Sequence, residues 1–343
     1  MSKELNQVWL DSHKIFSYIE TYCHYITKYL WYIEYMLFKV SLSLLAKYVE
    51  RQDKKFLKSH KTFGNFSVKK DLAYIDDGNK YHLLDILCPV LGKENGIVLF
   101  YIHGGAYIYG EKEASRVFCS YFTNHRFTVI AINYRLIDNK ENIDIKSQVQ
   151  DVFAALDFIY KNKNSLGLKL DKFCLTGDSA GGHLALMTDI VYHSKEAQEY
   201  YGIKHLPPIE IRCLGLNSTM YDYEGLYKAS YDTFSKRNVL KIFSKSALND
   251  EYLKMNSPRY YIEEKGIKLK PIFNSTSLHD LFKNESLKFK ISLSKYGLNL
   301  EHYFEPSVDK KIGHVYNHFE FKKEGKKCND AMIKFFKAHC NVE

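Results

Sequence analysis

The chain has 343 residues, of which 45% are hydrophobic, and its formal net charge is +9. This composition is ordinary for a globular protein and allows a hydrophobic core of normal size. The lysines are scattered and no nucleic-acid-binding signature accompanies them, so we expect a solvated basic surface and no nucleic-acid partner.

Seven cysteines lie between Cys23 and Cys340, and no two of them form a C-x-x-C motif. An odd number of cysteines without such a motif argues against a disulfide framework and against a structural zinc site. We therefore expect a reducing, cytoplasmic setting.

Residues 1–60 are predicted to form a helical cap segment. Apolar side chains recur there at helical spacing, at Ile15, Tyr18, Ile19, Tyr22 and Ile26. Charged residues interrupt the segment before an uncharged run reaches the roughly 18 residues that a membrane-spanning helix needs. No signal-peptide pattern is present. Packing onto the protein's own body is the main interpretation, and contact of residues 15–49 with a membrane surface is the alternative.

Residues 61–343 are predicted to form one domain in which strands alternate with helices. The expected strands are 66–75, 79–88, 97–102, 127–132, 173–176, 209–216, 271–276 and 300–304, and the expected helices are 146–161, 180–193, 284–296 and 326–339. The first two strands alternate as antiparallel strands do, whereas 97–102 is a continuous apolar run, typical of a strand buried on both faces. The pattern predicts an α/β fold with a mainly parallel central sheet flanked by helices.

Residues at about 220–260 interrupt this alternation with a polar, aromatic and helix-like segment. An insertion between two sheet strands would lie over the carboxyl ends of the strands, where open α/β sheets bind ligands. We therefore predict a cap insertion there.

The segment from Gly177 to Gly182 has the form G-x-S-x-G and lies between a short buried strand and a helix. A strand that turns sharply into a helix strains the backbone at the serine, so its neighbours must be small. The Oγ of Ser179 would then be exposed at the positive end of a helix dipole. Ser179 is the predicted nucleophile.

A second glycine-containing turn, His103-Gly104-Gly105-Ala106, directly follows the buried run 97–102. Acyl transfer needs backbone N–H donors aimed at a tetrahedral oxyanion, and glycines let a substrate approach them. We predict that Gly104 and Gly105 contribute two such donors and that the N–H of Ala180 contributes a third.

Together, His103–Tyr107, Asn133–Leu136 and Gly177–Gly182 resemble the hormone-sensitive-lipase-like branch of α/β-hydrolase esterases. Ala106 stands where that family usually has a third glycine, and the A-P-E that commonly follows Y-R-L is absent. The resemblance spans roughly residues 65–340 and implies an α/β-hydrolase fold with a helical cap.

The resemblance also implies an acid and a base. Asp280 follows a buried strand in a segment similar to the family's D-P-L-x-D-E, although an N-cap of the next helix is an alternative role. Four histidines follow it, at His302, His314, His318 and His339. Gly313-His314-Val315-Tyr316-Asn317 is similar to the family's G-H-V-F-N, so His314 is the predicted base. The chain order serine, acid, histidine is that of this fold.

The predicted function is hydrolysis of carboxylic esters, with short-chain acyl esters as the expected substrates. The reaction would proceed through Ser179, His314 and Asp280 and an acyl-enzyme, with Tyr107 and Tyr109 lining the acyl pocket. No phosphate loop is present, and no cofactor or metal is expected. An amidase or peptidase with the same triad, a membrane-surface lipase and a non-catalytic small-molecule receptor are the alternatives. The sequence does not indicate an oligomeric state.

Overall fold

The computed structural model describes residues 57–90, 92–137, 143–225, 249–319 and 321–342, with a few single positions between 44 and 55. Met1–Val49 and Glu50–Glu343 form two separate compact units. The elements below all belong to the second unit. The predicted helical segment 1–60 lies almost entirely outside the described residues, so it stays a prediction.

The second unit is built on one eight-stranded sheet in the order β1-β2-β4-β3-β5-β6-β7-β8. The strands are β1 (Phe66–Ala73), β2 (Leu83–Pro89), β3 (Val98–Ile102), β4 (Thr128–Ile132), β5 (Phe173–Asp178), β6 (Ile211–Asn217), β7 (Ile272–Ser277) and β8 (Leu300–Glu305). β2 pairs antiparallel with β1 and with β4. All the other pairings are parallel.

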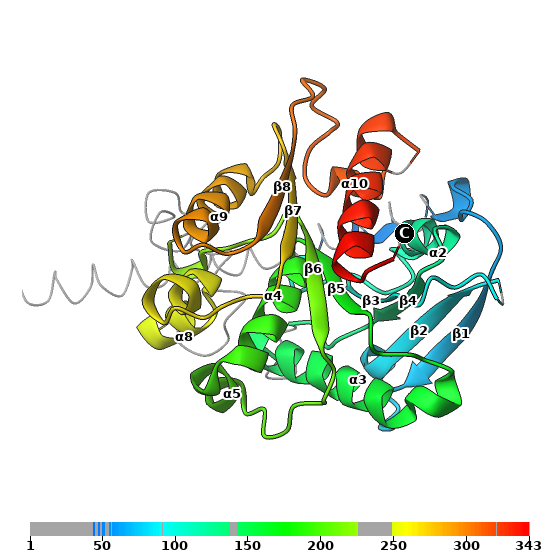
Figure 1. The fold of residues 1–343 in the computed structure, drawn as a ribbon, viewed down its shortest axis with the longest axis horizontal. Helices are drawn as coiled ribbons and strands as arrows, with labels where there is room; N and C mark the ends of the chain where they lie inside the picture. The colour runs from blue at the N-terminus through cyan, green and yellow to red at the C-terminus, as the bar shows by residue number, and fades with distance from the viewer. Residues whose placement is uncertain are drawn as a thin grey trace, which may run out of the picture. The chain divides into compact units, whose positions relative to one another are not determined.

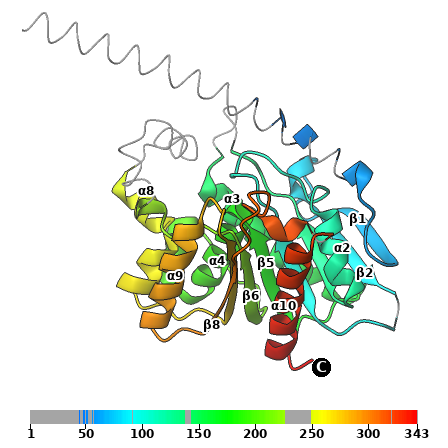
Figure 2. The same ribbon diagram turned by 90° about the horizontal axis from the view of Figure 1, so that it is seen from above.

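Helices cover both faces of the sheet (Figures 1 and 2). They are α2 (Arg116–Asn124), α3 (Ile145–Leu166), α4 (Ala180–His193), α5 (Lys195–Tyr201), α8 (Asp250–Met255), α9 (Lys283–Lys295) and α10 (Lys323–His339). α2 and α10 pack on one face, and α3 and α4 on the other. Short helical turns lie at η1 (Lys80–His82), η3 (Tyr260–Glu264) and η4 (Tyr316–His318).

Burial of both faces of the sheet explains why the residues before His103 form a continuous apolar run. Phe100 and Ile102 of β3 belong to the core under α3 and α4, whereas Leu99 and Tyr101 belong to the core under α2 and α10. Successive side chains point to opposite faces of a strand, so a strand covered on both sides is apolar throughout.

The predicted α/β-hydrolase fold with a mainly parallel sheet is confirmed, and every expected strand is present. β2 begins four residues later than expected, because residues 80–82 form a 3₁₀ turn whose N-cap, Asn79, accepts a hydrogen bond from the N–H of Tyr81. Helices α2 and α5 were not expected. The central part of the predicted cap insertion, residues 226–248, lies outside the described residues. Its C-terminal part forms α8 and leads into η3.

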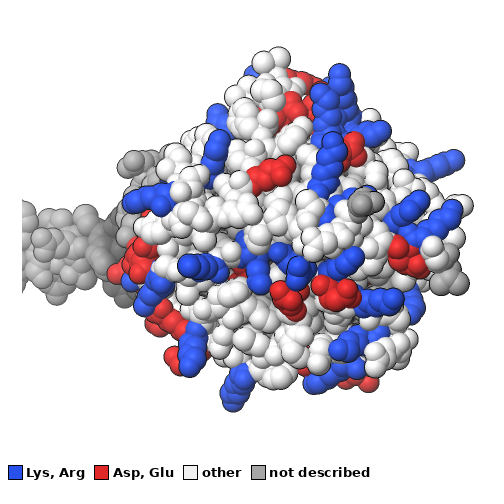
Figure 3. Space-filling model, viewed as in Figure 1, with Lys and Arg blue, Asp and Glu red and all other residues white. Residues whose placement is uncertain are grey.

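Among the described residues, no helix is long and apolar enough to cross a membrane. On the face drawn in Figure 3, lysine and arginine side chains are spread over the surface and interspersed with acidic ones.

A buried histidine ties the antiparallel edge of the sheet to α3. His82 Nδ1 lies 2.8 Å from Asp77 Oδ2, and its Nε2 lies 3.5 Å from Asp151 Oδ1. Arg135 donates to the same Asp151 carboxylate through Nε and Nη2. Burial alone would lower the pKa of His82, but Asp151 and Asp77 outweigh it and raise the pKa above its ordinary value.

A folded-state pKa above the unfolded value means that the native state binds a proton more tightly. This stabilisation is complete below the unfolded pKa of about 6.5 and is lost as the pH rises through the folded pKa. We expect His82→Gln to lower the melting temperature more at pH 6 than at pH 8.5. Thermal denaturation at both pH values measures this, with the exposed His205, changed to Gln, as the control. An equal loss at both values would contradict the assignment.

Candidate active site

The turn between β5 and α4 holds Ser179 in a backbone conformation that serine rarely adopts, with φ 51° and ψ −116°. The Ser179 N–H donates to the carbonyl of Asn217 at the end of β6, at 2.8 Å. A Cβ at Gly181 would lie 2.1 Å from the carbonyl oxygen of Ile102, so only glycine allows α4 to start this close to β3. These contacts form the sharp strand-to-helix turn predicted from G-x-S-x-G.

The Ser179 hydroxyl meets an imidazole and a carboxylate in one hydrogen-bonded chain. His314 Nε2 lies 2.9 Å from Ser179 Oγ, and His314 Nδ1 lies 2.9 Å from Asp280 Oδ1. Since the Asp280 carboxylate can only accept, Nδ1 carries the proton and Nε2 is left to accept from the serine. The structure thus brings together three residues that the sequence separates by up to 135 positions.

Asp280 is held as an anion although its side chain is fully buried. Burial alone would raise its pKa, but His314, Ser218 and the N–H of Phe282 together lower the pKa below its ordinary value. Thr276 also donates to its second oxygen, at 3.0 Å. The Phe282 N–H, in the turn before α9, donates to Asp280 Oδ1 at 2.9 Å. Asp280 therefore contacts the start of α9 as well as the His314 imidazole.

Two serines fix the loop that carries His314. The Oγ of Ser218, just past β6, accepts from the N–H of Val315 at 3.0 Å. The Oγ of Ser277, the last residue of β7, donates to the carbonyl of Ile312 at 2.8 Å. Sequence reasoning missed Ser218 and Thr276 as partners of the site. Their common feature is position, because Ser218 directly follows β6 and Thr276 lies near the carboxyl end of β7.

The turn after β3 lies against the elbow. A Cβ at Gly105, where φ is 124°, would lie 2.0 Å from the carbonyl oxygen of Tyr109, so this turn closes only with glycine. Tyr134 donates to the carbonyl of His103 at 2.8 Å and stacks on its ring. Within the described part of the chain, the backbone N–H groups of Gly104 and Ala180 donate to no carbonyl.

The two tyrosines expected near the substrate differ in exposure. The Tyr107 side chain is buried, with its ring edge-on to His183 at 5.8 Å, and its carbonyl accepts from Gln148. Tyr109 is half-buried. Burial lowers the pKa of His183 to about 4, so this ring is neutral and donates from Nε2 to the carbonyl of Asn256.

A second aspartate–histidine pair lies beside the elbow. Burial alone would raise the pKa of Asp178, but His318, Tyr101 and His103 lower it, so this residue is also an anion. His318 Nε2 lies 3.4 Å from Asp178 Oδ1, and its ring stacks on Phe118 at 4.3 Å.

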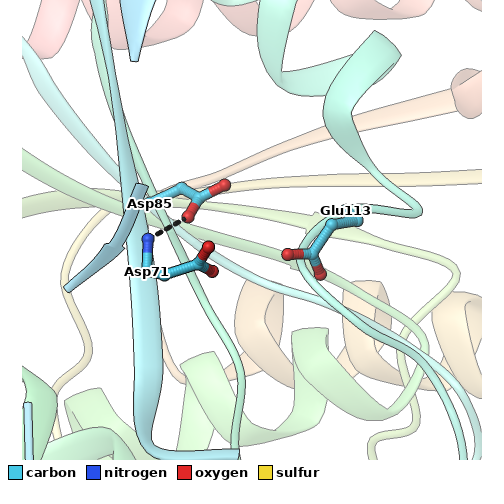
Figure 4. A group of neighbouring side chains, drawn as sticks. All are labelled: Asp71, Asp85 and Glu113. Carbon is cyan, nitrogen blue, oxygen red and sulfur yellow. Dashed lines mark hydrogen bonds between the residues drawn. The ribbon is translucent and has the colours of Figure 1, made fainter. Parts of the chain in front are cut away.

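Among the described residues outside this site, one cluster of carboxylates has the spacing of metal ligands. Asp71, Asp85 and Glu113 converge at the antiparallel edge of the sheet (Figure 4). The ammonium group of Lys112 contacts all three, at 2.7 Å from Asp71 and 2.9 Å from Asp85. A buried lysine therefore supplies the positive charge that these carboxylates need.

Comparison with known proteins extends these observations. The model of the BD-FAE family matches residues 84–273, more than half of the chain. The fold is similar to that of esterase B from Lactobacillus Rhamnosis, with a TM-score of 0.81, 21% identity, and coverage of 90% of this chain and 96% of the esterase. A second structure of that esterase carries a C4-C4 tributyrin phosphonate inhibitor.

Curated relatives match over shorter stretches. An arylesterase of Saccharolobus solfataricus is 33% identical over 107 residues, which is 31% of this chain and 34% of the relative. A putative α/β hydrolase of Acanthamoeba polyphaga mimivirus is 24% identical over 148 residues, or 43% of this chain and 42% of the relative. The chain therefore spans well under two thirds of the length of these relatives.

Proposed function

This chain belongs to the BD-FAE family of hormone-sensitive-lipase-like α/β hydrolases, and we propose that it is a serine esterase whose triad is Ser179, His314 and Asp280. The observation that carries the proposal is the continuous chain from Ser179 Oγ through both ring nitrogens of His314 to Asp280, with both distances at 2.9 Å. Nucleophile, base and orienting acid in this geometry form the arrangement that activates a serine for acyl transfer.

In the first half-reaction, Ser179 Oγ attacks the ester carbonyl while His314 Nε2 takes its proton. The buried Asp280 carboxylate keeps Nδ1 protonated and stabilises the imidazolium that forms. His314 then gives the proton to the leaving alcohol, and the acyl-enzyme remains. In the second half-reaction, His314 deprotonates a water molecule, which attacks the acyl carbonyl and releases Ser179.

The oxyanion of each tetrahedral intermediate would accept hydrogen bonds from the N–H groups of Gly104, Gly105 and Ala180. Ala180 is the first residue of α4, where a helix leaves its N–H groups without intrahelical partners. Gly104 lies against the elbow, since a Cβ there would be 2.2 Å from Asp178 Oδ2. Donors fixed by this packing need no reorganisation when charge develops.

The proposed substrates are small esters of short-chain acids, with Tyr107 and Tyr109 beside the acyl group and the segments 1–60 and 220–260 as a cap. The tributyrin phosphonate inhibitor of the similar esterase B supports short acyl chains. We also propose a cytoplasmic location, because the six cysteines in the described part are free thiols, which suits a reducing compartment.

The first test concerns the nucleophile. We expect Ser179→Ala to abolish hydrolysis of p-nitrophenyl acetate, with a circular dichroism spectrum and a melting temperature close to those of the wild type. A fluorophosphonate should label the wild-type protein at Ser179, as mapped by mass spectrometry, and should not label the variant. Hydrolysis near the wild-type rate in Ser179→Ala would refute the assignment.

The second test separates three of the histidines that follow Asp280 in the sequence. Loss of a triad base costs on the order of 10⁴ in kcat, so His314→Ala should be nearly inactive. His318→Ala and His302→Ala should stay within about tenfold of the wild type, a barrier change of at most about 1.4 kcal/mol. Wild-type activity should also fall in acid, because only neutral imidazole accepts a proton. An active His314→Ala beside an inactive His318→Ala would show that the base is misassigned.

The third test concerns acyl-chain length. A closed site that buries a small apolar group should favour acyl chains of about two to eight carbons over long emulsified lipids. A series of p-nitrophenyl esters from acetate to palmitate, compared by kcat/KM, measures this preference. Rates that continue to rise with chain length above the micellar threshold would favour a lipase acting at surfaces.

A further inference from the structure

Three cysteines from distant parts of the sequence meet on the face of the sheet that α10 covers. Cys174 lies in β5, Cys213 in β6, and Cys340 is the C-cap of α10. The Sγ of Cys174 is 3.5 Å from that of Cys213 and 3.4 Å from that of Cys340. All three side chains are buried, and the proposed esterase mechanism uses none of them.

We propose that this thiol cluster is an oxidation site at which a peroxide converts Cys174 and Cys340 into a disulfide. In the first step, the Cys340 thiolate attacks one peroxide oxygen, the O–O bond breaks, and protonation of the departing hydroxide releases water. Cys340 is then a sulfenic acid. In the second step, Cys174 sulfur attacks the Cys340 sulfur, and the leaving hydroxyl departs as water with the Cys174 proton. Two thiols are oxidised and one peroxide is reduced to two waters.

The environment of each sulfur assigns these roles. The thiols of Cys174 and Cys213 donate to Cys340 and lower its pKa, and the charges of Arg212 and Lys172 add to this effect. Burial raises the pKa of Cys174 above its ordinary value. The thiolate is the nucleophile toward an oxidant, and Cys340 lies at the end of α10 whereas Cys174 lies within β5. Cys340 therefore reacts first and Cys174 resolves the sulfenic acid.

Access and distance also favour this pair. Cys340 follows the last turn of α10, and helix ends open locally at a lower free-energy cost than core strands do. The two sulfurs, 3.4 Å apart, need to come about 1.4 Å closer to form a disulfide. Cys174 and Cys213 both lie within adjacent strands of the sheet, where the backbone restricts such an approach.

The disulfide would bind the end of α10 covalently to the central strand of the sheet. α10 also supports the loop of His314, because Asn329 donates to the carbonyl of Asn317 at 2.8 Å. A cross-link between residues 166 positions apart removes much freedom from the unfolded chain. Oxidation should therefore raise the melting temperature, by about 5 °C for a domain of this size.

The experiment treats the full-length protein, washed with EDTA, with a small excess of hydrogen peroxide. The protein is then denatured in the presence of N-ethylmaleimide, which blocks the remaining free thiols, and its peptides are mapped without reduction. We expect a Cys174–Cys340 linked peptide in the wild type, in Cys213→Ser and in the matched control Cys328→Ser, which changes another buried cysteine of α10. Cys340→Ser and Cys174→Ser should lack this link and the rise in melting temperature, and dithiothreitol should reverse both in the wild type.

Three results would overturn the proposal: a Cys174–Cys213 link in place of the expected one, over-oxidised thiols without a link, or the same labelling of Cys340 by N-ethylmaleimide with and without peroxide. The peptide map of the wild-type protein distinguishes these results from the expected link even if a serine variant folds poorly. Cys340→Ala provides a second variant at the same position. The test does not depend on esterase activity, so it fails or succeeds separately from the proposed function.

Discussion

The backbone of Ser179 at φ 51° and ψ −116° is the constraint around which the site is arranged. A non-glycine residue in a sparsely populated region costs on the order of 1–3 kcal/mol and persists only where its surroundings impose it. Here the surroundings are β5, which lies between β3 and β6 in the sheet, and the bond from the Ser179 N–H to Asn217. The neighbouring parallel strands therefore impose the strained backbone conformation of Ser179. This conformation directs the serine hydroxyl away from the helix that follows.

The same sheet explains how distant residues meet at that hydroxyl. The elbow follows β5, Ser218 follows β6, Asp280 follows β7 and the His314 loop follows β8, and these four strands are neighbours and parallel. Parallel neighbours bring their carboxyl ends to one edge. Asp280, three residues past β7, and His314, nine residues past β8, therefore both reach the serine. Hydrogen bonds between these loops, such as the one from the Val315 N–H to Ser218 Oγ, then fix the positions of the loops relative to one another.

Sequence patterns could predict the sheet because buried parallel strands are continuous apolar runs, and they could predict the elbow because small residues are sterically required there. α2 was missed because Ser115 provides no side-chain cap to mark its start and because the helix has only nine residues. α5 has a capping serine, Ser194, but only seven residues. Ser218 and Thr276 could not be selected because polar residues at strand ends are common. Only their contacts with Asp280, and that of Ser218 with the His314 loop, distinguish them.

Asp178 and Asp280 show that a carboxylate beside a histidine is not by itself a catalytic pair. Both are buried, and neighbouring groups lower the pKa of each against the effect of burial. The difference lies in where the imidazole points. His314 has one nitrogen on Asp280 and the other on Ser179 Oγ, whereas His318 stacks on Phe118 with its Nε2 toward Asp178. A base must reach the proton it removes before its pKa matters. Geometry therefore favours His314 over His318 as the proposed base, because only the His314 imidazole has a nitrogen within hydrogen-bond distance of Ser179 Oγ.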